Sequence, residues 1–399
     1  MQLEMVGWFD IAVAVIGRFW PVWIAMTACL ALSVGFRKQL GLYGDLFNTG
    51  VGFSAVVICL FWIATAVFAP AIAPFDPISQ IAAMKGALPG SMLPDGGGVY
   101  YFGGDSLARD VLSRMVYGSR IVMSIAPSAT AFALITGIGL GLPAGYYGGR
   151  IDSVLSFLVN LLLAFPVILL FYLLVTPDVR ELSFDNWFSE ATGIGLSIAR
   201  SFAAVIFFIP ILFFLTLFHT RFRSRPDCYL VSVGATLLIG AWIFAGVIFD
   251  ADPLGLLRVS ANYLNIFVGV VLGSSPSVFR IVRGLVMDIK TRDYIAAAQT
   301  RGESPWYIMI WEILPNARGP LIVDACLRVG YTTILLGTLG YFGLGVPPDS
   351  PDWGTAIKDA SRLLRAYIHP ALPPAIALMS FVLGLNLLAD ALREESLKD

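Results

Sequence analysis

The chain has 399 residues, of which 57% are hydrophobic and 13% charged, and its mean hydropathy is +0.80. Soluble domains are usually about 45–50% apolar, so this composition excludes an ordinary soluble domain. The net charge of −1 gives no sign of the basic surface that nucleic acid or a polybasic membrane anchor would require. The apolar runs are long enough for membrane-crossing helices and lack the alternation of barrel strands, so we expect an all-α integral membrane protein.

Candidate membrane spans follow one another along the chain when hydropathy is read in windows of about 19 residues. The nine spans are 15–35, 49–69, 121–145, 153–175, 194–218, 229–249, 262–282, 319–343 and 371–390. Arg18 and Pro21 interrupt the start of the first span, where an interfacial helix followed by a shorter crossing is the alternative.

Basic residues gather in the loops that follow the odd-numbered spans. By the positive-inside rule these loops face the cytoplasm, which places the amino terminus outside and the carboxyl tail inside. The stretch 70–120 also carries basic residues and would lie outside, where interspersed aspartates offset their charge. The basic residues of the cytoplasmic loops are Arg37, Lys38, Arg150, Arg221, Arg223, Arg225, Lys290, Arg292, Arg301 and Arg318.

The outer stretch 70–120 combines prolines, glycines and charged residues. Its first prolines stop the preceding helix and favour an extended path. Asp105 or Ser106 is expected to cap a short helix that lies along the membrane. Two interpretations remain open for this part, a solvated cap or a surface that contacts a substrate directly. The charged residues concerned are Asp105, Arg109, Asp110 and Arg114.

No arrangement typical of covalent chemistry is visible in the sequence. The four cysteines are scattered without paired spacing, and we expect them to act as small hydrophobic residues. His219 and His369 have no Ser, Cys or Asp partner at a spacing that suggests a nucleophile. A glycine-rich phosphate loop is also missing, so any ATP that drives this protein must be hydrolysed by another subunit.

A polar, charged stretch at 293–316 lies between two apolar spans. Alanines at 296–298 favour a helix, Gly302 can end it, and Ser304 with Pro305 can begin a second one. Ile295, Trp306, Ile308, Met309 and Ile313 are expected to anchor one side, while the charged side chains stay in water. The step Leu-Pro-Asn at 314–316 is expected to stop the second helix. A plain amphipathic loop is the simplest interpretation of this composition.

This stretch resembles the EAA loop of bacterial ABC importer permeases, whose helix docks on the ATPase subunit. Further stretches resemble the dipeptide, oligopeptide and nickel permeases, specifically the second, C-type permease of each pair. The resemblance covers about 49–176 and 262–395. The stretches are Ala-Pro-Phe-Asp-Pro at 73–77, Gly-Asp-Ser-Leu-Ala-Arg-Asp-Val-Leu-Ser-Arg at 104–114, Tyr-Gly-Ser-Arg at 117–120, Gly-Tyr-Tyr-Gly-Gly-Arg-Ile-Asp at 145–152, Trp-Gly at 353–354 and Asn-Leu-Leu-Ala-Asp-Ala-Leu-Arg at 386–393.

The resemblance implies a type I ABC importer transmembrane domain with about six core helices and roughly three additional ones. It divides the chain into an extra helix and linker at 1–48, a first core helix and periplasmic segment at 49–120, and the transmembrane domain at 121–395, with an inserted helix pair at 177–261. By that resemblance the docking residues of the coupling loop at 293–316 are Asp293, Tyr294, Ala296, Ala297, Ala298, Arg301, Gly302, Glu312, Leu314 and Pro315.

The resemblance also implies a function and partners. The chain would be a permease subunit of the bacterial inner membrane that pairs with a second permease, two cytoplasmic ATPases and an external solute-binding protein. Peptides or related small solutes would be carried. No cofactor is expected on this chain, because ATP and Mg²⁺ would bind the ATPases. The chain would touch membrane lipid and no nucleic acid.

Three positions depart from the family pattern. Ala296 stands where the loop usually carries Glu, which removes a carboxylate that could meet the ATPase. Glu312 stands where this subfamily usually has His, and Ala108 where it has Gly. The inserted helix pair is the largest departure, and we expect it to be peripheral to the transport core.

Several polar residues near the predicted spans are candidates for a gate or pore. Asn160 could line the pore or form an interhelical hydrogen bond, and Pro166 is expected to kink its span. Arg280 and Arg283 could anchor the cytoplasmic end of their span or line its mouth. Asp152 could close a cytoplasmic gate or cap a helix in a simple turn.

Two other functions are consistent with parts of the sequence. An ion-coupled secondary transporter would need intramembrane carboxylates, and Asp324 is the one plausible example, although we expect it to pair with Arg328. A scaffold subunit that transports nothing would explain the additional helices and the change at Ala296. An importer permease accounts for more of the motifs than either alternative does.

Overall fold

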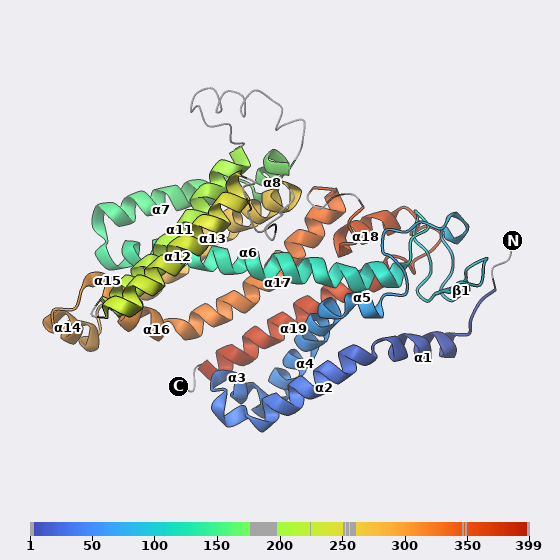
Figure 1. The fold of residues 1–399 in the computed structure, drawn as a ribbon, viewed down its shortest axis with the longest axis horizontal. Helices are drawn as coiled ribbons and strands as arrows, with labels where there is room; N and C mark the ends of the chain where they lie inside the picture. Colours follow the sequence, from blue (N-terminus) through green and yellow to red (C-terminus); the bar gives the residue numbers. More distant parts are fainter. Residues whose placement is uncertain are drawn as a thin grey trace. The chain divides into compact units, whose positions relative to one another are not determined.

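A computed structural model describes residues 4–175, 198–223, 225–249, 252, 255, 261–344, 347 and 349–396. Helices dominate it (Figure 1). The chain divides into two compact units, one formed by Met1–Pro127 with Cys326–Asp399 and the other by Ser128–Ala325. Two helices, α6 (Val111–Tyr147) and α17 (Arg318–Phe342), contribute residues to both units. The all-α membrane fold is therefore confirmed.

The first unit is built around α4 (Gly50–Val67) and α19 (Leu372–Ser396), which pack against each other. Gly384 allows this approach, because a Cβ there would meet Ile58 and Cys59. Helix α2 also packs on α4. The other helices of the unit are α1 (Trp8–Arg18), α2 (Trp20–Gly35), α3 (Leu42–Asp45), α5 (Ala69–Ile72) and α18 (Trp353–Ser361).

The outer stretch folds into a small irregular layer. Its strands β1 (Ser91–Met92) and β2 (Val99–Tyr100) pair antiparallel, and Ser91 lies opposite Tyr100. Met84, Leu93 and Tyr100 form its core. The expected short helix along the membrane is wrong. Helix α6 runs for 37 residues from Val111, about 55 Å at 1.5 Å per residue, because no break separates its polar first turns from the apolar span.

The second unit contains α7 (Gly149–Ala164), α8 (Val167–Val175), α11 (Ile198–Phe222), α12 (Pro226–Phe249) and α13 (Ala261–Ile289). Helix α13 packs against α7, α8 and α11, and α11 packs against α12. Small residues bring α6 and α13 together. A Cβ on Gly137, Gly141 or Gly145 would press on valine side chains of α13, so this glycine stripe sets the spacing of the two helices.

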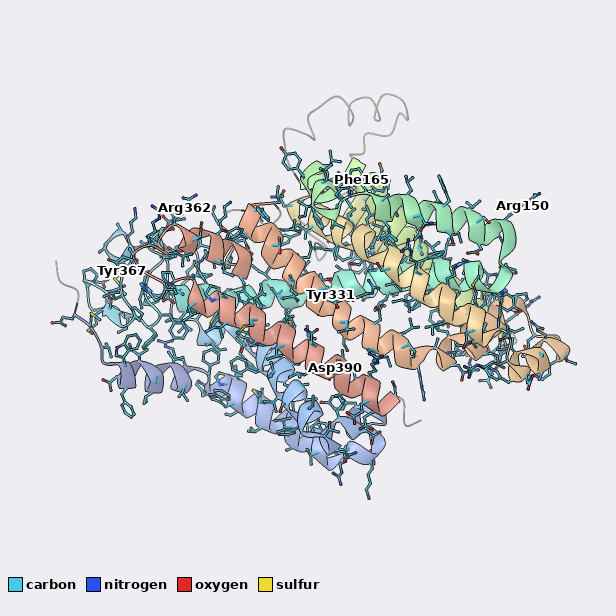
Figure 2. All side chains as sticks on the ribbon, turned by 180° about the vertical axis from the view of Figure 1, so that it is seen from behind. Arg150, Phe165, Tyr331, Arg362, Tyr367 and Asp390 are labelled. Atoms are coloured by element: carbon cyan, nitrogen blue, oxygen red, sulfur yellow. The ribbon has the colours of Figure 1, made fainter. Side chains whose placement is uncertain are left out.

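Within the described ranges, seven helices are long and apolar enough to cross a membrane, or nine if two bent pairs each form a span. The pair α1 and α2 bends by 52° between Arg18 and Pro21, where the sequence predicted an interruption. The pair α7 and α8 bends by 82° at Pro166, which confirms the predicted kink. Figure 2 labels Arg150 and Phe165 at the two ends of α7. The stretch 176–197, where the predicted fifth span begins, lies outside the described residues.

Candidate functional site

The coupling segment, defined as residues 293–316, begins with two helical pieces joined at a glycine. Helix α14 (Asp293–Thr300) ends before Gly302, whose φ of +79° favours glycine and whose N–H donates to the Gln299 carbonyl at 2.9 Å. Ser304 Oγ accepts the Tyr307 N–H at 3.3 Å, and Pro305 begins α15 (Pro305–Tyr307). The predicted glycine joint and serine cap are confirmed.

The second half of the coupling segment differs from the prediction in one turn. A π-helical turn, Ile308–Ile313, follows α15 and leads into α16 (Leu314–Asn316). Leu314 and Pro315 are still helical, but the helix ends at Asn316, so the expected stop at 314–316 is confirmed. Only Ala317 separates α16 from α17.

Burial divides the coupling segment into a packed and an exposed face. Ile295, Ala298, Ile308, Met309 and Ile313 are buried in one core with the carboxyl end of α13. Trp306 was expected on this face but is 37% exposed. The opposite face is open to solvent and carries the proposed docking residues Asp293, Tyr294, Ala296, Ala297 and Arg301.

Polar contacts hold the coupling segment to α6. Lys290, just before the segment, donates from Nζ to the Gly145 carbonyl at 2.8 Å, and Gln299 Nε2 lies 3.4 Å from the Tyr146 hydroxyl. The carbonyls at the carboxyl end of a helix carry partial negative charge, so a lysine there is favourable. Side-chain contacts at its start and its buried apolar face thus hold the segment in place, while its opposite face stays exposed.

Glu312 and Trp311 link the coupling segment internally and to α11. Arg301 Nη2 lies 3.0 Å from Glu312 Oε1 and joins the two halves of the segment. Trp311 donates from Nε1 to Thr220 Oγ1 at 3.1 Å, and the Arg221 guanidinium lies 5.1 Å from the Trp311 ring. The additional helix α11 therefore touches the coupling segment directly. Its peripheral place relative to the transport core stays a prediction.

Four of the five candidate gate residues form contacts between α7 and α13, and only Pro166 takes no part in them. Arg283 forms a two-bond ion pair with Asp152, with Nη2 2.6 Å from Oδ2, and Arg280 donates to Asn160 Oδ1 at 2.8 Å. The interhelical hydrogen bond expected for Asn160 is confirmed. The cap expected of Asp152 is wrong, because Gly148 precedes α7 and no side chain caps it.

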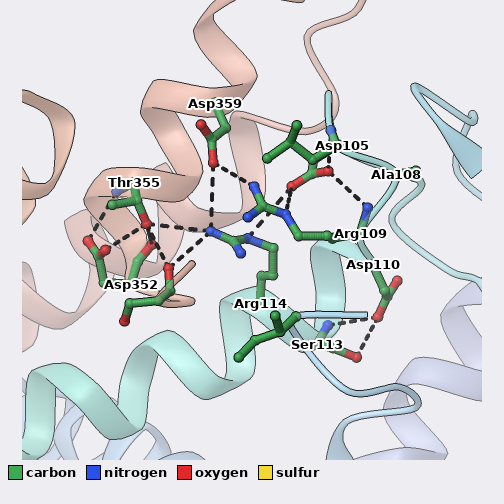
Figure 3. A network of polar contacts seen from close by, with 12 residues as sticks. Asp105, Ala108, Arg109, Asp110, Ser113, Arg114, Asp352, Thr355 and Asp359 are labelled. Carbon is green, nitrogen blue, oxygen red and sulfur yellow. Dashed lines mark hydrogen bonds and ion pairs between the residues drawn. The ribbon is translucent and has the colours of Figure 1, made fainter. Parts of the chain in front are cut away.

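The charged residues of the outer stretch form a buried network in the first unit (Figure 3). Asp105 accepts the backbone N–H groups of Leu107 and Arg109 at 2.8 and 2.9 Å and the Arg109 Nε–H at 2.7 Å. Arg109 is fully buried and also donates to Asp359 of α18 at 2.5 Å. Both earlier interpretations, a solvated cap and a substrate-contacting surface, are therefore wrong for these side chains.

Arg114 extends this network from α6 to the start of α18. Its Nη2 donates to the Ser350 carbonyl at 3.2 Å and to Thr355 Oγ1 at 3.4 Å. Asp352 caps α18 by accepting the N–H groups of Gly354 and Thr355, and burial raises the pKa of its carboxyl. The side chains from α6 and α18 thus pair away from solvent, although Nε and Nη1 of Arg114 donate to no acceptor among the described residues.

Asp110 provides the cap that was expected from Asp105 or Ser106. Its Oδ2 accepts the Ser113 N–H at 2.8 Å and the Ser113 hydroxyl at 2.6 Å. The side chain is fully buried, and this burial raises the pKa of the carboxyl to about 6 although the two Ser113 hydrogen bonds oppose the shift. Ala108, two residues earlier, has a φ of +63°, which explains why a glycine was expected there.

Two of the stretches that resemble the family, 117–120 and 353–354, meet in the first unit. Trp353 packs over Gly118, where any Cβ would clash with the indole ring, and donates from Nε1 to the Met115 carbonyl at 2.8 Å. Gly354 lies against the backbone of Gly337. These glycines are needed for close contact, so the two stretches Tyr-Gly-Ser-Arg and Trp-Gly act as one packing unit.

Several residues of these sites were missed by sequence reasoning. Asp352 had a recognisable signal, since an aspartate directly before Trp-Gly is a helix cap pattern. Asp359, Lys290 and Thr220 had none, because each meets a partner far away in the sequence.

The pairing of Asp324 with Arg328 stays a prediction. Among the residues that the structure describes, no group of three or more His, Cys, Asp or Glu side chains could hold a metal ion.

Residues 137–394 match the family described as "Binding-protein-dependent transport system inner membrane component". The dipeptide transport system permease protein of Haemophilus influenzae is 27% identical over 328 residues, which cover 82% of this chain and 83% of that protein. The di/tripeptide transport system permease protein of Pseudomonas aeruginosa is 27% identical over 330 residues, 82% of each chain. A glutathione transport system permease protein of Pectobacterium atrosepticum is 25% identical over 295 residues, 74% of this chain and 71% of that protein. The family match includes α7, α13 and the coupling segment.

Proposed function

Because the chain belongs to the family of binding-protein-dependent transport system inner membrane components, we propose that it is one permease subunit of an ATP-driven importer for peptides or related small solutes. The protein is a multi-pass component of the inner membrane. The relatives named as dipeptide, di/tripeptide and glutathione permeases support the solute class. A second permease subunit, two cytoplasmic ATPases and an external solute-binding protein would complete the importer, with ATP and Mg²⁺ bound by the ATPases.

The division of the coupling segment into two faces is the observation that supports this proposal most strongly. Ile295 and Ala298 fix α14 to the core, while Ala296 and Ala297 project into solvent between them. The small side chains on the exposed face of this helix, whose other face is packed in the core, leave room for a partner's surface to approach the backbone. A protein that only crossed the membrane would have no need for such a helix beyond its spans.

The coupling segment would receive the motion of the ATPases and pass it to the spans. Helix α13 ends at Ile289, only a few residues before α14, so displacement of α14 acts directly on α13. The Asp152–Arg283 and Asn160–Arg280 contacts then connect α13 to α7. ATP binding would bias two arrangements of these helices, and its effect is limited to the difference in docking free energy between them.

Ala296 changes the chemistry of the proposed docking face. The usual glutamate would offer a carboxylate to a basic group of the ATPase, whereas Ala296 offers only a methyl group. Docking would therefore depend on shape and apolar contact, with Tyr294 as the large exposed side chain nearby. This difference predicts that coupling in this chain is less sensitive to salt than charge-based docking would be.

Co-purification with the products of adjacent genes tests the proposal. We expect an ATPase and a second permease to accompany the wild-type chain, and Ala297→Glu to lose the ATPase alone, because Ala297 is exposed and its replacement leaves the core intact. Gly302→Pro should lose it too, since proline cannot adopt the positive φ of this joint. Lys38→Glu, an exposed change on the loop after the first span, is the matched control.

The opposite result has a clear meaning. If the wild-type chain retains no ATPase in mild detergent, the docking role of the coupling segment is wrong for this protein. An ion-coupled transporter or a scaffold subunit would then explain the exposed α14 better. If Lys38→Glu loses the ATPase as fully as Ala297→Glu, the effect is not specific to the coupling segment.

A further inference from the structure

A large cavity lies within the second unit, between the α11–α12 hairpin and the coupling segment. Its volume is 1010 Å³, and its walls come from α11, α12 and residues 302–307. We propose that this cavity binds an anionic phospholipid of the surrounding membrane, with the headgroup phosphate near Arg221 and Arg223 and an acyl chain along the hairpin. This inference rests on the proposed function in one respect: that function places the cavity at the cytoplasmic side of the membrane.

The cavity lining changes from polar to apolar along the hairpin. Arg221, Arg223 and Tyr229 line it near the turn between α11 and α12, whereas Leu212 and Leu237 line it farther into the helices. An elongated ligand with a charged end and a hydrocarbon end matches this order. A soluble nucleotide or a peptide would leave the leucine end unfilled, because it has no long apolar part to bury.

The length of the apolar part suits an acyl chain. Leu212 lies ten residues before the end of α11 at Phe222, which is about 15 Å at 1.5 Å per residue. The hydrocarbon layer of a bilayer is roughly 30 Å thick, so the cavity reaches about as far as one leaflet. Helices α11 and α12 are both candidate membrane spans, and therefore lipid surrounds them.

The charge at the polar end of the cavity favours an anion. Arg221 and Arg223 line the cavity, and Glu303 is the one carboxylate among its lining residues. Glu303 lies 4.0 Å from Arg301, which offsets its charge. Ser304 and Tyr229 add hydroxyl donors, and the hydroxyl of Tyr229 is 3.2 Å from His219 Nδ1 across the two helices. Basic pockets at the cytoplasmic ends of spans are typical sites for anionic headgroups.

A lipid in this cavity would touch the coupling segment itself. Gly302, Ser304 and Trp306 form one wall, which includes the glycine joint between α14 and α15. The same joint connects the exposed docking helix to the buried half of the segment. Bound lipid would hold the joint in one geometry, so membrane composition would regulate how well the segment receives an ATPase.

Lipid retention by the purified full-length chain, without any ATPase, tests the proposal. The chain is loaded with a mixture of phosphatidylglycerol and phosphatidylcholine in detergent, and bound lipid is counted by native mass spectrometry. We expect wild type to retain phosphatidylglycerol, and Arg221→Gln with Arg223→Gln to reduce this preference roughly tenfold. Arg225→Gln removes one positive charge beside the cavity but lies outside the cavity lining, and it should retain the lipid.

A second pair of variants tests the apolar end. Val233→Trp fills the cavity and should reduce retention of both lipids, whereas Val231→Trp, at a position that is 72% exposed, should not. Equal retention in wild type and in both cavity variants would overturn the proposal. Displacement of phosphatidylglycerol by millimolar inorganic phosphate or ATP would also overturn it, because the site would then recognise a soluble phosphate. These results are independent of whether an ATPase associates with the chain.

Discussion

The buried network around Arg109 and the coupling segment around Arg301 use the same residue types in opposite ways. The Arg109 side chain is 0% exposed and its carboxylate partners come from its own chain, whereas the Arg301 side chain is 56% exposed and its partner Glu312 is 26% exposed. Charges that are buried and paired fix one backbone arrangement. Charges that remain in water leave a surface available for another protein.

The charged pairs of the two regions should therefore contribute differently to the free energy of unfolding. Removing one partner of a buried pair leaves an uncompensated charge and costs about 3–5 kcal/mol. An exposed pair contributes about 0–1 kcal/mol. The network is therefore expected to determine the stability of the first unit, while the coupling segment is expected to affect function with little effect on folding.

Arg109→Leu should have the largest effect on stability. The change leaves the Asp359 carboxylate with only Arg114 nearby, at 3.9 Å, and should lower the free energy of unfolding by about 3–5 kcal/mol. Thermal unfolding in detergent measures the loss. Arg362→Leu, an exposed arginine one residue beyond α18, is the control and should change stability little. A loss below about 1 kcal/mol for Arg109→Leu would contradict the role of the network.

Asp110 should make the stability of the first unit depend on pH. Its pKa is raised to about 6 in the folded chain, against about 3.9 when unfolded, so the folded state binds the proton more tightly between these values. The free energy of unfolding should therefore fall as pH rises from 4 to 6, by on the order of 3 kcal/mol.

Unfolding titrations of wild type and Asp110→Asn measure this dependence. The asparagine keeps an oxygen that accepts the Ser113 N–H but carries no charge, so the slope should become smaller, and what is left includes the contribution of Asp352, whose pKa is also raised. An unchanged slope in Asp110→Asn would assign the titration to another group.

Ala108→Gly should stabilise the chain modestly. A left-handed φ costs an ordinary residue about 1–2 kcal/mol, and glycine avoids most of that cost, so we expect a gain of about 1 kcal/mol. Ala83→Gly, in a nearby 3₁₀ turn without positive φ, should give no gain. Equal shifts in the unfolding temperature of both variants would show that strain at Ala108 is unimportant.

The smallest effect is expected for the pair Arg301 and Glu312. A double-mutant cycle with alanine at both positions should give a coupling energy below about 1 kcal/mol, because both side chains are partly in water. The measurement is the unfolding temperature of the four variants. A coupling above about 2 kcal/mol would remove the contrast between the two regions.

The sequence predicted the parts of the fold that depend on local pattern. Apolar runs indicated the helices. Pro166 indicated the bend between α7 and α8, and Gly302 with Ser304 indicated the joint in the coupling segment. Each of these features follows from backbone preferences or from hydropathy over one short window. They required no knowledge of which helices become neighbours.

The errors concern partners that are distant in sequence. Four charges of alternating sign at 105–114 are typical of a solvated loop, and nothing near them shows that α18 supplies Asp359, 250 residues beyond Arg109. The contact between Thr220 and Trp311 was unforeseen for the same reason, since α11 was interpreted from its apolar content alone. Such pairings follow from the packing of whole helices.

The π-helical turn at Ile308–Ile313 changes the rotational phase of the coupling segment. It holds more residues per turn than an α-helix, and each residue of an α-helix turns the direction of the side chain by about 100°. The side chains after this turn therefore point in directions that a regular helix would not give them. Within the turn itself, Ile308 faces the core, Trp311 reaches Thr220 and Glu312 meets Arg301. One irregular turn lets a short stretch of chain contact three different neighbours.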